Sequence, residues 1–205
     1  HESQSLLFEM QVCRSYRFVK WAAPIISRAF KGSDNAWDPD NLYRLYTNVN
    51  PSLIRVDADE VTYPAHIILR YKLERAMLDR KLHVNDLPSA WNDLIRELLG
   101  IEVKSHTDGC LQDIHWYDGA WGYFPTYTLG AMTAAQFFKS ACESDQNILE
   151  SISNGNFEPL VSWLSTHVHN KGRLLNAPEL LEKVTGEPLN PDIYINHLKT
   201  RYLDC

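Results

Sequence analysis

Apolar residues recur at helical spacing through most of the chain, and prolines and glycines separate the segments that show this spacing. The first segment contains Pro24, where we expect a kink or a helix boundary. The fold class is therefore predicted to be mainly α. The predicted helices lie at about 3–30, 39–49, 59–81, 88–100, 123–141, 144–153, 157–168, 178–185 and 191–202.

Residues 101–122 interrupt this pattern. The segment lacks helical periodicity and is rich in Gly, Asp, His and Trp. At most a short β-hairpin is predicted near 101–117, with strands at 101–104 and 112–117. Because loops held by a rigid scaffold often carry functional groups, this segment is the first place to look for a site.

The composition narrows the function classes. The chain has 205 residues, about the size of one domain, and a formal net charge of −6. That charge argues against a nucleic-acid or anionic-membrane surface, and no apolar run approaches the length of a membrane span. The four cysteines are widely spaced and contain no CxxC pair, so we expect free thiols and a cytoplasmic protein.

Two acidic segments have a structural and a chemical interpretation. Glu2 suits the first turn of a helix, where the macrodipole favours a carboxylate. In residues 54–59, Asp59 is a candidate helix cap, and Arg55 would then pair with Asp57 or Asp59. Alternatively, Arg55 points into a cleft, where its guanidinium can bind a carboxylate through two hydrogen bonds.

A third candidate lies in residues 109–127. Tyr123 and Tyr127 are four apart and would share a helix face, with His115 a short way upstream. Imidazole and phenol donors together could polarise a carbonyl and stabilise an oxyanion. The structural alternative is an aromatic core patch with a buried His115 that Asp113 satisfies.

These segments together resemble three signature motifs of the carboxypeptidase Taq family. HESQ at 1–4, IRVDAD at 54–59 and GCLQDIHW at 109–116 match that family's HES/GQ, IRxxAD and GxxQDxHW, and GYFPTY at 122–127 fits too. The resemblance implies the helical half of a cleft fold like that of angiotensin-converting enzyme and neurolysin. It also implies a carboxypeptidase that uses zinc or cobalt to activate water, acts on peptides with a free C-terminus, and forms a homodimer at full length.

The resemblance also implies roles for individual residues. Glu2 would be a metal ligand, and Arg55 would hold the C-terminal carboxylate of the substrate. His115 and Tyr127, with Tyr123 as an alternate, would stabilise the oxyanion. The expected substrate cleft would further contain Tyr63 and Trp116, and Gln112 and Asp113 would line it or orient His115.

Three further motifs of the family, HPF, DxRxT and HExxH, precede HES/GQ in its members and are absent from this sequence. We therefore expect residues 1–205 to be the C-terminal portion of a single larger helical catalytic domain. Since a zinc site needs three protein ligands, the chain alone is predicted to be inactive and to bind no zinc tightly. The alternative is a non-catalytic helical interaction module that has kept the family motifs.

Overall fold

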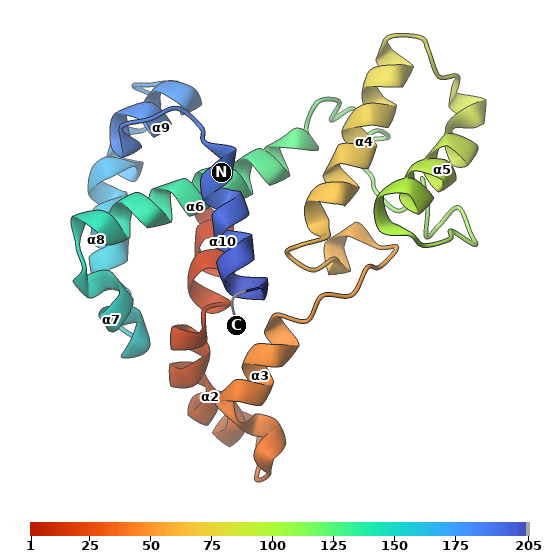
Figure 1. The fold of residues 1–205 in the computed structure, drawn as a ribbon. Helices are drawn as coiled ribbons and strands as arrows, with labels where there is room; N and C mark the ends of the chain where they lie inside the picture. The colour runs from red at the N-terminus through yellow and green to blue at the C-terminus, as the bar shows by residue number, and fades with distance from the viewer. Residues whose placement is uncertain (204–205) are drawn as a thin grey trace. The chain divides into compact units, whose positions relative to one another are not determined.

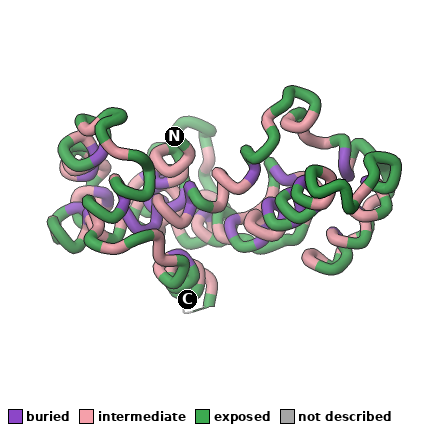
Figure 2. Tube along the Cα trace, turned by 90° about the horizontal axis from the view of Figure 1, so that it is seen from above, coloured by how far each residue is buried: buried purple, intermediate pink, exposed green. Residues whose placement is uncertain are grey.

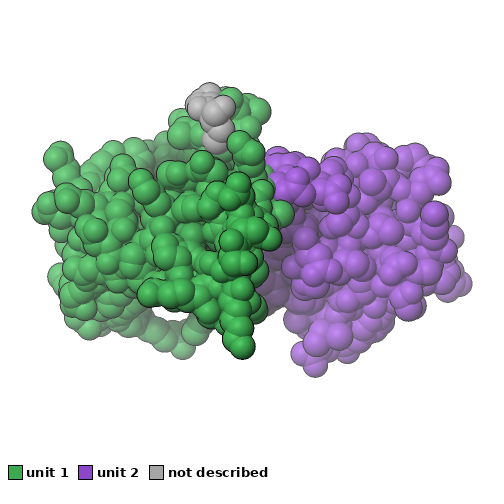
Figure 3. All heavy atoms as spheres, turned by 90° about the horizontal axis from the view of Figure 1, so that it is seen from below, with its two compact units in different colours: residues 1–47, 130–205 green, residues 48–129 purple. Residues whose placement is uncertain are grey.

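The computed structural model describes residues 1–203, which form two compact units (Figure 3). Of the described residues, one unit contains 1–47 and 130–203, and the other contains 48–129. Both are helical, and the part of the chain that the structure describes contains no β-strand. The predicted fold class, mainly α, is confirmed.

The first unit contains most of the helices (Figure 1). Its elements are α1 (Glu2–Leu6), η1 (Leu7–Cys13, a π-helix), α2 (Tyr16–Phe30), η2 (Asn35–Trp37), α3 (Pro39–Tyr46), most of α6 (Pro125–Ser144), α7 (Asn147–Ser153), α8 (Glu158–His167), η5 (His169–Lys171), α9 (Ala177–Thr185) and α10 (Pro191–Tyr202). The second unit contains η3 (Arg55–Asp57), α4 (Tyr63–Leu78), η4 (Val84–Asp86), α5 (Leu87–Leu99) and the first residues of α6.

The N-terminal segment is divided at a position that the apolar pattern does not mark. Helical spacing over 3–30 predicts a kink or a helix boundary at Pro24, but the break lies at Ser15, whose backbone is extended. The Ser15 hydroxyl accepts a hydrogen bond from the Phe18 backbone N–H at 3.2 Å and caps α2. Pro24 lies inside α2, so the capping serine, and not the proline, sets this boundary.

An apolar core joins η1, α6, α7, α8 and α9 in the first unit. Small residues of α6, including Ala134 and Ala141, are fully buried and allow neighbouring helices to pack closely against it. Figure 2 shows these buried positions as purple segments of the trace. The core consists of Leu7, Val12, Ala134, Phe137, Ala141, Ile148, Ile152, Leu160, Leu164, Val168 and Leu181.

The second unit has a smaller apolar core between α4 and α5. It consists of Leu69, Leu73, Leu87, Trp91, Ile95 and Cys110. In the helix predicted at 59–81, the apolar spacing predicts that Ile67, Ile68, Tyr71 and Ala76 point inward. Ile67 is buried, but Ile68 is 44% exposed and Tyr71 is 45% exposed. The buried face of α4 therefore differs from the expected apolar face, because it also carries polar residues.

Residues 100–124 contain turns, and the hairpin considered near 101–117 does not form. Local hydrogen bonds shape the segment. The Ser105 hydroxyl lies 2.8 Å from an Asp108 carboxylate oxygen, and the Asp108 backbone N–H donates to the same hydroxyl at 3.2 Å. With these side-chain contacts in place, the backbone adopts turns without a strand ladder.

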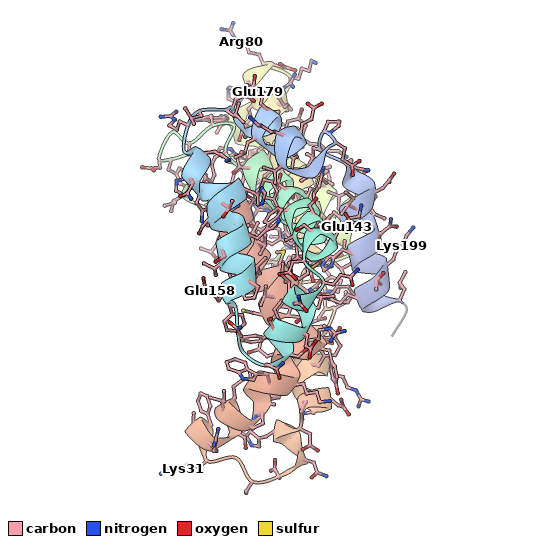
Figure 4. The ribbon with its side chains drawn as sticks, turned by 90° about the vertical axis from the view of Figure 1, so that its left-hand side faces the viewer. Lys31, Arg80, Glu143, Glu158, Glu179 and Lys199 are labelled. Carbon is pink, nitrogen blue, oxygen red and sulfur yellow. The ribbon has the colours of Figure 1, made fainter. Side chains whose placement is uncertain are left out.

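Charged side chains cover the outer faces of the helices. Figure 4 shows Glu158 of α8 and Lys199 of α10 pointing away from the helices that carry them. Within residues 1–203, no helix is long and apolar enough to cross a membrane.

Candidate functional site

The second unit is organised around a row of polar side chains on the inward face of α4. Tyr63, His66, Arg70 and Glu74 are spaced three, four and four residues apart, which places them on one side of the helix. His66 and Arg70 are 0% exposed and Glu74 is 3% exposed. Burying polar groups is costly unless they are bonded, so the partners of these residues define the site.

Asp113 is the partner of two arginines. Its Oδ1 accepts hydrogen bonds from Arg55 Nε at 2.9 Å and lies 2.8 Å from Arg55 Nη2. Its Oδ2 lies 2.6 Å from both Nε and Nη2 of Arg70. One carboxylate therefore joins η3, α4 and the 101–122 segment. The expected pairing of Arg55 with Asp57 or Asp59 is wrong, because Arg55 turns inward to Asp113.

The charges in this cluster stabilise one another. Burial alone would raise the pKa of Asp113, but Arg70 and Arg55 outweigh it and hold that pKa below its ordinary value. Burial likewise opposes the charge of Arg55, yet Asp113 and Tyr63 raise its pKa above the usual range. Burial lowers the pKa of Arg70 to about 10, so it stays charged at neutral pH.

Gln112 connects the same elements through its side-chain amide. Its oxygen accepts from the Arg55 backbone N–H at 2.9 Å and from Arg70 Nη2 at 2.8 Å. Its nitrogen donates to the carbonyl oxygens of Leu53 and Asp108, each at 3.0 Å. Both ends of the amide are thus bonded within the chain, and Gln112 fixes the segment that carries Arg55.

Glu74 holds the end of the 101–122 segment. One carboxylate oxygen accepts from the indole Nε1–H of Trp116 at 2.9 Å, and the other accepts from the Gly122 backbone N–H. Gly122 has φ +83°, a left-handed conformation that favours glycine. This contact sets where the chain turns into α6 and hence where the first aromatic residues of α6 lie.

His115 and the tyrosines form an aromatic group next to Arg55. His115 Nε2 lies 3.0 Å from the Tyr127 hydroxyl. The rings of Tyr63 and Tyr123 lie with their centroids 6.3 and 5.4 Å from that of Tyr127. Burial, followed by the charge of Arg55, lowers the pKa of His115, so its imidazole is neutral at neutral pH.

The alternative in which Asp113 satisfies a buried His115 does not match the structure. His115 Nδ1 lies 3.9 Å from Asp113 Oδ1, which is too far for a hydrogen bond, and it has no hydrogen-bond partner among residues 1–203. The imidazole is thus oriented through its other nitrogen by Tyr127. Its side chain and those of Tyr63, Trp116 and Tyr127 are only half-buried, and Tyr123 is exposed.

Arg55 keeps hydrogen-bonding capacity in this arrangement. A guanidinium has five N–H donors. Nε and Nη2 bond to Asp113, and Nη1 donates to the Tyr63 hydroxyl at 2.9 Å. Two N–H groups, one on each terminal nitrogen, have no partner in the part of the chain described here. The guanidinium carbon also lies 5.0 Å from the centre of the Tyr127 ring.

Glu2 belongs to the first unit. It begins α1 and packs tightly against α6, because a Cβ placed on Gly130 would lie 2.7 Å from the Cβ of Glu2. Gln4, in the same motif, bonds to the imidazole of His169 at 2.8 Å. Among residues 1–203, no group of three His, Cys, Asp or Glu side chains could hold a metal ion. Glu2 alone does not make a metal site, and the residues present do not fit a complete one.

The sequence motifs did not reveal Arg70, Glu74 and His66. A signal for them existed, since His66, Arg70 and Glu74 recur every four residues beside the apolar Leu69 and Leu73. A polar row on the buried side of an apolar helix indicates partners elsewhere in the chain. Gly130, inside a helical pattern, was a comparable signal of close helix packing.

Known proteins that are similar to this chain identify its family. The model of the carboxypeptidase Taq (M32) metallopeptidase family matches residues 1–202. Thermostable carboxypeptidase 1 of Pyrococcus furiosus is 37% identical over 99% of this chain, and carboxypeptidase 1 of Bacillus subtilis is 37% identical over 98%. Among solved structures, metallocarboxypeptidase 1 of Trypanosoma cruzi superposes with a TM-score of 0.95 at 40% identity, covering 100% of this chain and 41% of its own.

The chain therefore belongs to the carboxypeptidase Taq family of metallopeptidases, as the motifs predicted. An M32 carboxypeptidase from Deinococcus radiodurans also superposes over the whole chain, with a TM-score of 0.95 at 38% identity. The chain spans 40% of the length of the Pyrococcus and Bacillus relatives and 41% of the Deinococcus structure.

Proposed function

We propose that the chain is the C-terminal part of the catalytic domain of a metal-dependent carboxypeptidase, which releases C-terminal amino acids from peptides. Family membership supports the class of reaction. The observation that carries the proposal is Arg55, a guanidinium fixed by Asp113 and Tyr63 that retains two N–H donors beside His115 and Tyr127. A fixed guanidinium with remaining N–H donors suits the free carboxylate at the end of a peptide.

His115 and Tyr127 would act on the carbonyl of the bond that is cleaved. The Tyr127 hydroxyl, which His115 Nε2 contacts at 3.0 Å, would donate to the carbonyl oxygen of the substrate. A donor placed where negative charge develops stabilises the transition state more than the ground state. Tyr123, 39% exposed and in ring contact with Tyr127, is the alternate donor.

The remaining site residues would fix these groups. Gln112 was predicted to bind substrate, and its bonds to Arg55 and Arg70 support a positioning role as well. Tyr63 would border the bound carboxylate through its contact with Arg55. Glu2 would supply one ligand to the metal, whose chemistry in the complete enzyme is to activate water. Zinc or cobalt as that metal, and a homodimer with a cytoplasmic location, remain predictions.

Two experiments test the proposal. The 205-residue chain should contain no stoichiometric zinc and should not hydrolyse peptides, which metal analysis and a peptidase assay would measure. Stoichiometric zinc with turnover would contradict the claim that the chain is only part of the active site. In the complete enzyme, Tyr127→Phe should lower kcat more than it changes KM, and an unchanged kcat would contradict the oxyanion role of Tyr127.

The alternative is a helical interaction module without catalysis. The sequence of the gene upstream of His1 separates the two. An HExxH motif a short way upstream supports the enzyme, and a start codon directly before His1 supports the module.

A further inference from the structure

Arg70 is the arginine of the site that cannot reach a substrate. Its side chain is 0% exposed, and each of its guanidinium nitrogens is bonded inside the chain. Nε bonds to Asp113, Nη2 to Asp113 and Gln112, and Nη1 to the carbonyl oxygen of His66 at 2.9 Å. The indole of Trp91 covers one face, with its centre 4.7 Å from the guanidinium carbon.

The charge balance of the cluster depends on this buried residue. Arg55 and Arg70 share one carboxylate, so the three side chains carry a net charge of +1. Without Arg70, Arg55 and Asp113 would form a neutral pair. Glu74, the next acidic residue along α4, bonds to Trp116 and Gly122 and not to either arginine. His66 and His115 are neutral near pH 7, because burial lowers the pKa of each.

We infer that Arg70 is a positioning residue that gives the Arg55–Asp113 pair its net positive charge, and so makes the subsite prefer a carboxylate over an uncharged peptide end. It does this without touching the substrate. The inference rests on the proposed role of Arg55 as the carboxylate ligand. A neutral pair could still donate hydrogen bonds, but it would have no electrostatic preference for an anion.

Three variants separate the effect of the charge of Arg70 from the effect of its shape. Arg70→Gln keeps an amide donor and removes the charge, whereas Arg70→Lys keeps the charge and changes the geometry. Arg70→Gln combined with Asp113→Asn removes one positive and one negative charge, which leaves Arg55 unopposed and restores +1. Arg75→Gln is the matched control, because Arg75 lies on the same helix with its side chain 57% exposed.

The experiment is an NMR titration of the full 205-residue chain with N-benzoylglycine and with N-benzoylglycinamide, which differ only in the charged end. The wild type and Arg75→Gln should bind the acid more tightly than the amide. Arg70→Gln should reduce this preference by about tenfold, the effect of one unit charge at short range in a partly buried site. Arg70→Lys and the double variant should each retain most of it.

The outcomes are distinguishable. A wild type that binds acid and amide equally contradicts the role of Arg55, and with it that of Arg70. A wild-type preference that survives in Arg70→Gln contradicts Arg70 alone. If Arg70→Gln loses its native spectrum, the other two variants decide. Loss of the preference for the acid in a folded Arg70→Lys or a folded double variant overturns the charge argument. A preference that is kept in both supports it. If none of the three variants folds, Arg70 is required for folding, which overturns a role confined to charge.

Discussion

Replacing His66 tests how the buried cluster responds to pH. Its imidazole is fully buried beside Arg70 and Arg55. Burial, followed by the charges of Arg70 and Arg55, lowers its pKa from 6.5 to about 4. A hydrogen bond with the Ser52 backbone and the charge of Asp113 act in the opposite direction, but more weakly. Protonation would therefore add a third positive charge beside Arg55, Arg70 and Asp113.

The pKa values of His66 in the unfolded and folded chain determine how the free energy of unfolding changes with pH. In the unfolded chain His66 takes up a proton near pH 6.5, whereas in the folded chain it stays neutral down to about pH 4. The unfolded state binds more protons in this window, so the free energy of unfolding falls as the pH drops through it. The shift corresponds to a loss of about 3 kcal/mol in full, of which about 2 kcal/mol is reached at pH 5.

The assay is hydrogen exchange of peptides from residues 48–129, measured at pH 7.5 and pH 5 and corrected for the intrinsic exchange rate. Wild-type protection should fall by about 2 kcal/mol at pH 5, and His66→Phe should remove most of this dependence because its ring cannot be protonated. His106→Gln, at an exposed position of the same unit, should behave as the wild type. An equal loss of protection in wild type and His66→Phe would refute the assignment to His66.

Three further changes have defined outcomes. Gly130→Ala should lower the free energy of unfolding by about 1–3 kcal/mol in urea titrations, because its Cβ would lie 2.7 Å from that of Glu2; a gain in stability would contradict this contact. Glu74→Gln should speed hydrogen exchange in residues 116–122 and leave the helix content unchanged, whereas unchanged exchange would mean that the carboxylate does not hold this turn. Cys142 should react slowly with iodoacetamide at pH 8, because burial raises its thiol pKa to about 11; rapid modification would contradict that burial.

The sequence predicted the helical class and most helix positions because proline and glycine mark where periodic segments end. α10, expected at 191–202, lies at Pro191–Tyr202. The break at Ser15 was missed because a capping serine inside an apolar pattern has a weak signal. The absence of a hairpin near 101–117 follows from side-chain contacts that composition does not reveal.

Only part of the candidate site could be predicted from the sequence. The spacing of four residues placed Tyr123 and Tyr127 together, and their rings are in contact, although α6 begins at Pro125 and Tyr123 lies just before it. The pairing of Arg70 with Asp113 could not be predicted, since 43 residues separate them and no local pattern relates them. Asp57 and Asp59 are nearer to Arg55 in the sequence, yet Arg55 pairs with Asp113, the carboxylate that it shares with Arg70.

The role proposed for Arg55 is to bind the free carboxylate of a peptide. It is tested by the ratio of kcat/KM for a peptide with a free C-terminus to that for the same peptide amidated, measured in the complete enzyme and in its Arg55→Ala variant. We expect the ratio to fall by about 100-fold in the variant, mainly through a higher KM for the free acid. A ratio that Arg55→Ala leaves unchanged would contradict it.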